Sequence, residues 1–90
     1  MNDAFVKEYL LDKIDSQASI SIIKYCKNNL GSAGSYFHAA CQLGEMYAKF
    51  FAEEEIGAEF RYINIFQRVC KRWNVDYRIW FDTMCDIVYC

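Results

Sequence analysis

His38 is the only histidine in the chain, and it lies three residues before Cys41. If this stretch is helical, the two side chains share one face and could hold a metal ion together or pair as a base and a nucleophile. Glu45 is the nearest carboxylate downstream that could orient the imidazole. Zinc sites, however, usually draw on several closely spaced Cys and His residues, whereas the other cysteines are scattered at positions 26, 70, 85 and 90. We therefore expect a solvated histidine and a packed thiol, with no bound metal.

No other set of residues has the composition of a catalytic centre. The chain lacks a glycine-rich phosphate loop, and its acidic residues gather at Asp12 and Asp15 and at Glu53–Glu55. These acids suit a solvated surface, whereas a carboxylate pair for acid–base catalysis needs one member buried beside the other. The sequence therefore predicts a protein that is not an enzyme and that uses no cofactor.

The stretch VCKRWNVDYRIWFDTM, residues 69–84, resembles the centre of a DNA-binding helix-turn-helix. In that motif the second helix enters the major groove, and its outward side chains meet the bases. The outward side chains here are Arg78, Ile79, Asp82, Asp86 and Tyr89. Acids on such a face repel a polyanion, so we favour two core helices joined by a tight turn. A nucleic-acid-binding regulator that uses residues 58–89 is the alternative function.

Charge is distributed unevenly along the chain, although the formal net charge is only -2. Residues 45–59 carry five Glu and one Lys, whereas residues 60–74 carry three Arg, one Lys and no acid. If the helices on either side of Gly57 fold back on each other, the basic residues lie beside Glu53–Glu55. That pairing would explain the asymmetry without nucleic acid. The basic residues that share one helix face are Arg61, Arg68, Lys71 and Arg72.

Helical spacing of the apolar residues predicts five helices. Asp15 and Ser16 interrupt the first pattern, and Gly31 suits the C-terminal end of the second helix. The stretch GSAGS, residues 31–35, is the only loop-like segment, and Ser35 is a good cap for the third helix. The predicted helices span residues 3–14, 17–30, 36–56, 58–73 and 76–89.

Two of these helices carry further signals. The third helix has only a narrow polar stripe, so we expect it at the centre of the bundle, packed on several sides. The fifth helix can be capped by Asn74 or Asp76, both of which precede it.

Hydrophobic residues make up 54% of the 90-residue chain. A domain of this size buries only part of its surface, so some of the apolar side chains need a partner to cover them. Small side chains recur every four residues on the third predicted helix and would let another helix approach closely. We therefore expect a homodimer built on the small residues Ala40, Gly44 and Ala48.

These features predict a single all-α domain over residues 1–90, a compact bundle that binds another macromolecule, most simply a protein. An accessory, adaptor or inhibitor role suits a small acidic protein without a catalytic site, and a phage or mobile element is the expected source. No leader or membrane-length apolar run is evident, which favours a cytoplasmic protein with reduced cysteines. Aromatic residues and arginine are enriched at interfaces. The predicted partner-binding residues are Arg61, Arg68, Lys71, Arg72, Trp73, Tyr77 and Trp80.

Overall fold

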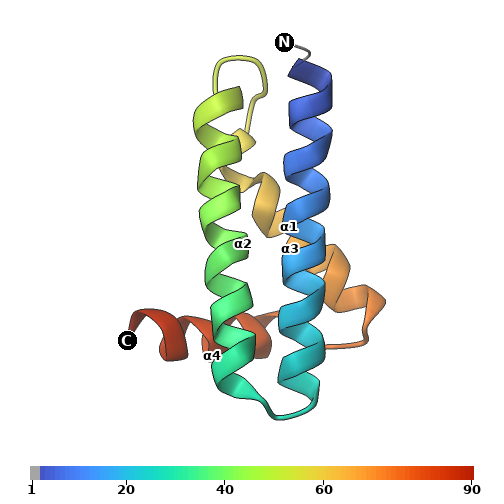
Figure 1. Cartoon of the computed structure of the whole chain (residues 1–90), viewed down its shortest axis with the longest axis vertical. Coiled ribbons are helices and arrows are strands. Elements are labelled where there is room, and N and C mark those ends of the chain that lie inside the picture. Colours follow the sequence, from blue (N-terminus) through green and yellow to red (C-terminus); the bar gives the residue numbers. More distant parts are fainter. Residues whose placement is uncertain (1–2) are drawn as a thin grey trace.

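The computed structural model describes residues 3–90, which form four α-helices and one short 3-10 helix, with no strand in this range. Helices α1 and α2 make an antiparallel hairpin, and α3 and α4 pack together on one side of it (Figure 1). The all-α prediction is confirmed, but the predicted count of five helices is wrong. The elements are α1 (Asp3–Cys26), α2 (Leu30–Phe51), η1 (Ala58–Phe60), α3 (Arg61–Arg72) and α4 (Tyr77–Tyr89).

The first two predicted helices are one continuous helix, α1. Asp15 does not end the first pattern, because its carboxylate points from the middle of α1 toward α3 and forms ion pairs there. Ser19 donates a further hydrogen bond to Asp15, with 3.4 Å between Oγ and Oδ1. An acid that would otherwise suit a helix cap is therefore tolerated inside the helix by partners that are distant in sequence.

The turn between α1 and α2 is formed by two asparagines. Asn28 has a φ of 60°, and the amides of Asn28 and Asn29 bond to the carbonyls of Tyr25 and Lys24. This is the bonding pattern of a left-handed helix C-cap, so Asn28 takes the place expected for Gly31. The Asn29 side chain then caps α2 by accepting a hydrogen bond from the amide of Ser32.

The predicted loop over residues 31–35 is wrong, because these residues form the first turns of α2. Ala33 and Gly34 are buried. Ser21 of α1 donates a 2.7 Å hydrogen bond to the Ala33 carbonyl. A Cβ on Gly34 would lie 3.0 Å from the Ile87 side chain of α4. Tertiary packing on both sides therefore outweighs the weak helix propensity of Gly and Ser.

The last two predicted helices are confirmed with small changes of boundary. Helix α2 ends at Phe51, and the chain turns through Gly57, whose φ is 82°. Helix α3 follows η1 and ends before Asn74, which has a φ of 56°. Asp76 caps α4 by accepting a 3.0 Å hydrogen bond from the amide of Ile79. No helix among residues 3–90 is long and apolar enough to cross a membrane.

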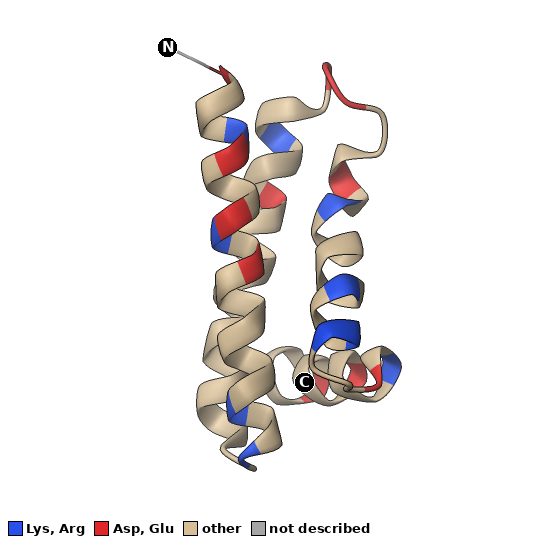
Figure 2. Ribbon diagram, turned by 90° about the vertical axis from the view of Figure 1, so that its right-hand side faces the viewer, with Lys and Arg blue, Asp and Glu red and all other residues tan. Residues whose placement is uncertain are grey.

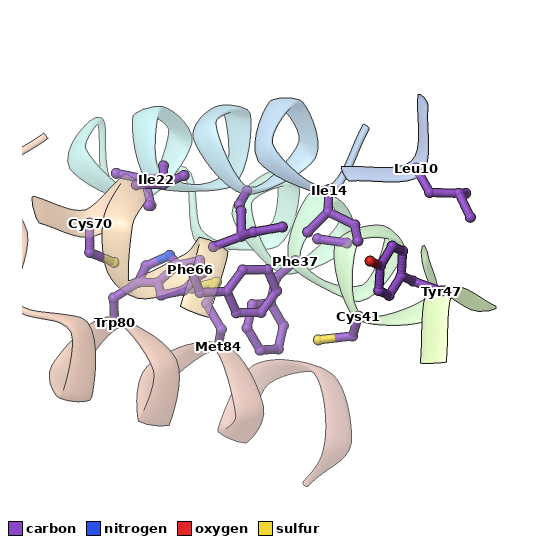
Figure 3. Close-up of a cluster of buried hydrophobic side chains, with 14 of the residues drawn as sticks. Leu10, Ile14, Ile22, Phe37, Cys41, Tyr47, Phe66, Cys70, Trp80 and Met84 are labelled. Atoms are coloured by element: carbon purple, nitrogen blue, oxygen red, sulfur yellow. The ribbon is translucent and has the colours of Figure 1, made fainter. Parts of the chain in front are cut away.

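The core is centred on Phe37 of α2 (Figure 3). Helix α2 contacts α1, η1, α3 and α4, but one of its faces is exposed, so it is less enclosed than the sequence predicted. The Phe37 ring packs on Phe66 of α3 and on Trp80 and Phe81 of α4, with centroid separations of 5.7, 5.3 and 5.5 Å. Aromatic pairs at such separations stabilise a core beyond the area that they bury. One side chain of the hairpin thus contacts both helices of the second layer.

Gly44 is a position of close approach between α2 and α3. A Cβ built at this position would lie 2.5 Å from Cγ and 2.6 Å from Cβ of Tyr62. The Tyr62 ring also packs at a right angle on Phe66, with 5.4 Å between the centroids. The small side chain at position 44 therefore admits an aromatic residue of the same chain.

We expect Gly44→Ala to destabilise the fold by about 1–3 kcal/mol, since the added methyl group overpacks the Tyr62 contact. The stability would be measured by urea unfolding. Gly31→Ala is the matched control, because a Cβ there meets nothing within 4 Å. The control should leave stability unchanged or raise it through better helix propensity. Equal effects of the two substitutions would contradict the packing at Gly44.

Candidate interaction site

The basic face predicted on α3 is ion-paired within the chain. Arg72 binds Asp15 of α1 through two hydrogen bonds of 3.1 and 3.2 Å, and Arg68 lies 3.7 Å from the same carboxylate. Arg61 lies 3.2 Å from Glu55. The expected pairing with Glu53–Glu55 is thus seen for Glu55 alone, and Asp15 was not anticipated. These arginines connect the two layers, which accounts for them without an external partner.

The other predicted partner-binding residues are divided between surface and core. Lys71 is exposed and has no ion pair within residues 3–90, and Trp73 at the end of α3 is also exposed. Tyr77 is half-buried, and this burial raises the pKa of its phenol to about 12. Trp80 is fully buried in the core, so we no longer include it among residues that a partner could touch.

The predicted self-association residues also lie mainly inside the molecule. Ala40 and Gly44 are buried, and Ala48 is half-buried. Gly44 accommodates Tyr62 of the same chain. Gly44 thus serves the contact between α2 and α3, and the buried Ala40 and Gly44 offer little surface to a second copy.

His38 and Cys41 do not form a nucleophilic pair. The Nδ1 atom of His38 lies 3.0 Å from the hydroxyl of Tyr89, a partner that the sequence did not suggest. Cys41 is buried, and desolvation raises the pKa of its thiol to about 12. Since the thiolate is the nucleophilic form, this cysteine is unreactive near neutral pH. Within residues 3–90 no three His, Cys, Asp or Glu side chains are grouped as a metal site would need.

Glu55 is held by groups from three helices. Tyr47 of α2 donates a 2.6 Å hydrogen bond to Oε1, and Lys7 of α1 lies 3.1 Å from the same oxygen. Arg61 of α3 lies 3.2 Å from Oε2. The Tyr47 hydrogen bond, with the two cations, lowers the pKa of Glu55 below its ordinary value. This carboxylate therefore fixes the connection between α2 and η1 to the rest of the molecule.

The fixed connection presents apolar side chains to solvent. Ile56 follows Glu55 directly and is fully exposed, and Phe60 of η1 is 62% exposed. Three acidic residues of the same segment are also exposed, and none of them forms an ion pair within residues 3–90: Glu53, Glu54 and Glu59. We call residues 52–60 the acidic tip, and Figure 2 shows it at the end of the molecule where α1 begins.

Protein interfaces commonly combine an apolar centre with a polar rim, and the acidic tip has both kinds of side chain. The sequence did not indicate this arrangement, because the exposure of Ile56 depends on the early end of α2 and on the turn at Gly57. The only signal was an isoleucine inside an acidic run next to a glycine, EEEIG. The chain matches no protein-family model, no curated protein and no solved structure.

We expect Glu55→Gln to reduce the free energy of unfolding by about 1 kcal/mol near pH 7, since charged hydrogen bonds are lost. Because folding lowers the pKa of Glu55, the contribution of its carboxylate is fully present above the ordinary glutamate pKa of about 4.3. It disappears as the pH falls through the lower folded value. Urea unfolding of both proteins should therefore give a difference near neutral pH that shrinks in acid.

Glu54→Gln is the matched control, because Glu54 is the preceding residue, is exposed and has no ion pair within residues 3–90. This substitution should change stability by no more than a few tenths of a kcal/mol, about the range of ordinary surface changes. If Glu55→Gln behaved in the same way, the proposed anchoring of the acidic tip would be incorrect.

We expect no binding to duplex DNA at about 150 mM salt. The arginines of α3 are already paired with acids, and α4 exposes Asp82 and Asp86 beside Arg78. Fluorescence anisotropy with a mixed-sequence duplex would test this. Tight binding that weakens steeply with salt, and weakens further in Lys71→Glu, would instead support the nucleic-acid-binding alternative. Lys71 is the suitable residue because its reversal breaks no ion pair among the described residues.

Proposed function

We propose that this protein is a small non-catalytic helical module that binds another protein and acts as a homodimer in the cytoplasm. Its role is of the accessory, adaptor or inhibitor type, in which the protein alters a partner by occupying its surface. The partner is a protein, and the capture experiment described below is designed to identify it.

The observation that carries the proposal is the exposure of Ile56 on a connection that is already fixed. Glu55, the preceding residue, is bound by Lys7, Tyr47 and Arg61, so little backbone freedom remains to be lost on binding. Ordering a flexible loop weakens association, and a preformed loop avoids that cost. A large apolar side chain held in this way is a suitable anchor for a pocket on another protein.

Charge indicates the kind of pocket that fits. Glu53, Glu54 and Glu59 surround the exposed apolar residues of the acidic tip and are free of ion pairs within residues 3–90. A partner surface with basic residues around an apolar pocket would be attracted to this end of the molecule, whereas an acidic surface would be repelled. The same acids oppose nucleic acid as a partner at this site.

The test is capture from an extract of the native host, with the full-length protein as bait and mass spectrometry as the readout. We expect at least one protein to be retained by the wild type and reduced by about 30-fold with Ile56→Asp, the effect of losing a hot spot of about 2 kcal/mol. Ile79→Asp is the control, since Ile79 is an exposed isoleucine on α4, away from the tip.

The control bait should retain the same protein as the wild type. Thermal unfolding of all three baits would establish that each is folded, and this is expected because both isoleucines are exposed. Retention that is equal for Ile56→Asp and the wild type would exclude the acidic tip as the binding site. A wild-type bait that retains no protein above an unrelated helical bait would count against protein binding itself.

A further inference from the structure

The α1–α2 hairpin has two broad faces, and only one of them is covered. Helices α3 and α4 lie on the same side of the hairpin, where Gly44 meets Tyr62 and Gly34 meets Ile87. Figure 1 looks onto the opposite side, and Figure 2 shows the two layers edge-on. Among residues 3–90 no element packs on that opposite side, which we call the open face.

The residues of the open face follow from helical spacing. On α2 they lie about half a turn from Phe37, Cys41 and Gly44, which point toward the second layer. On α1 they lie on the side away from Asp15, which points toward α3. The apolar members are Tyr9 and Ile20 of α1 and Ala39, Leu43, Met46 and Phe50 of α2, and the same spacing places the polar residues Lys13, Gln17 and Gln42 among them.

Three large apolar side chains of this face are exposed. Tyr9, Met46 and Phe50 are exposed, and Phe50 alone is 63% exposed. The Lys13 ammonium lies over the Tyr9 ring, 5.9 Å from its centroid, so a cation borders this part of the face. Several large apolar side chains exposed on one face favour a contact site.

The open face is large enough for a stable dimer. A helix of α2's length, 22 residues, extends about 33 Å at a rise of about 1.5 Å per residue, and two adjacent helices are about 20 Å wide. The face therefore measures roughly 650 Å² on each copy. Two copies would bury roughly 1,300 Å², which lies within the range of about 1,200–2,000 Å² for specific interfaces.

The two ends of the hairpin carry opposite charge. The end that holds the acidic tip exposes Glu53 and Glu54. The opposite end, where α1 finishes, carries Lys24 and Lys27, neither of which has an ion pair within residues 3–90. Figure 2 shows acidic ribbon only in the half of the hairpin nearer the acidic tip, where basic ribbon also occurs, and basic ribbon alone at the opposite end. A copy of the same chain therefore complements this one only when the two hairpins run in opposite directions.

We propose that a second copy of this chain covers the open face, with the two hairpins antiparallel, so that the acidic end of each copy lies over the basic end of the other. This arrangement is isologous, the commonest symmetry of homodimers. It rests on the homodimer of the proposed function and specifies the surface and direction of that dimer. It also replaces the small-residue stripe of Ala40, Gly44 and Ala48 as the interface.

Sedimentation equilibrium of the full-length protein tests the surface. The wild type should have the mass of two chains at micromolar concentration, and Phe50→Lys should weaken the dimer at least tenfold, because it places an ammonium group in an apolar contact. Ile79→Lys is the matched control, with an apolar side chain of similar exposure, 59%, on α4 in the other layer. This control should remain as dimeric as the wild type.

Charge reversal tests the direction. Glu53→Lys with Glu54→Lys should weaken an antiparallel dimer, and Lys24→Glu with Lys27→Glu should weaken it as well, since each places like charges together. The protein that carries all four substitutions should regain dimerisation, because the two ends are again opposite in sign. A parallel dimer would gain nothing from the combination, so a fourfold variant as weak as the two double variants would overturn the antiparallel arrangement.

The outcomes separate the two proposals. A wild type that stays monomeric at high micromolar concentration would refute the homodimer of the proposed function and the open-face contact with it. A wild-type dimer that Phe50→Lys leaves intact would refute the open-face contact alone. Circular dichroism of each variant would establish its folding, and Met46→Lys, at a neighbouring exposed position, provides a second test of the same surface if Phe50→Lys is unfolded.

Discussion

The absence of a side chain at Gly44 is the constraint on which the second layer depends. Tyr62 occupies the space that a Cβ would fill, and this contact sets the distance between α2 and α3. Phe66, one turn further along α3, then reaches Phe37 and Trp80. Because one ring on α2 meets side chains from both α3 and α4, the close approach at Gly44 also helps to position α4. The arrangement also determines which side chains of α3 and α4 face the solvent.

Electrostatics reinforces this packing at both ends of α3. Arg61 and Arg72 lie at opposite ends of the helix, and each binds an acid held by the hairpin or by the connection that follows it. Surface ion pairs contribute little singly, but the two oxygens of Asp15 hold Arg72 in a fixed orientation. Three of the four basic residues that the sequence predicted to bind a partner are therefore paired within the chain, and Lys71 alone has no ion pair among the described residues.

Short-range sequence signals, such as caps and apolar spacing, were sufficient to predict the helices of the second half of the chain. They were insufficient for the first half. The sequence offered Asn74 and Asp76 as caps of the last helix, and the structure uses Asp76, because a helix cap acts over only a few residues. In the first half, Asp15 led to the wrong prediction of a helix break. It resembles a helix cap, but its partner Arg72 is 57 residues away in the sequence. Likewise, the glycines and serines of residues 31–35 resemble a loop until Ser21 and Ile87 pack against them. For the candidate site, the sequence predicted Glu53–Glu55 beside the basic helix, and the structure shows this pairing for Glu55 with Arg61 alone. The exposure of Ile56 depends on where α2 ends and could not be predicted from composition.

The order of the elements along the chain has a consequence for synthesis. The asparagine turn closes the hairpin from residues that are neighbours in sequence, so α1 and α2 can associate before α3 and α4 have left the ribosome. During that interval Phe37 lacks Phe66 and Trp80, and the hairpin carries apolar side chains on both of its broad faces. At this stage the nascent chain exposes the most apolar surface. A chaperone, or the hairpin of a neighbouring nascent chain, would therefore bind it most readily before α3 and α4 emerge.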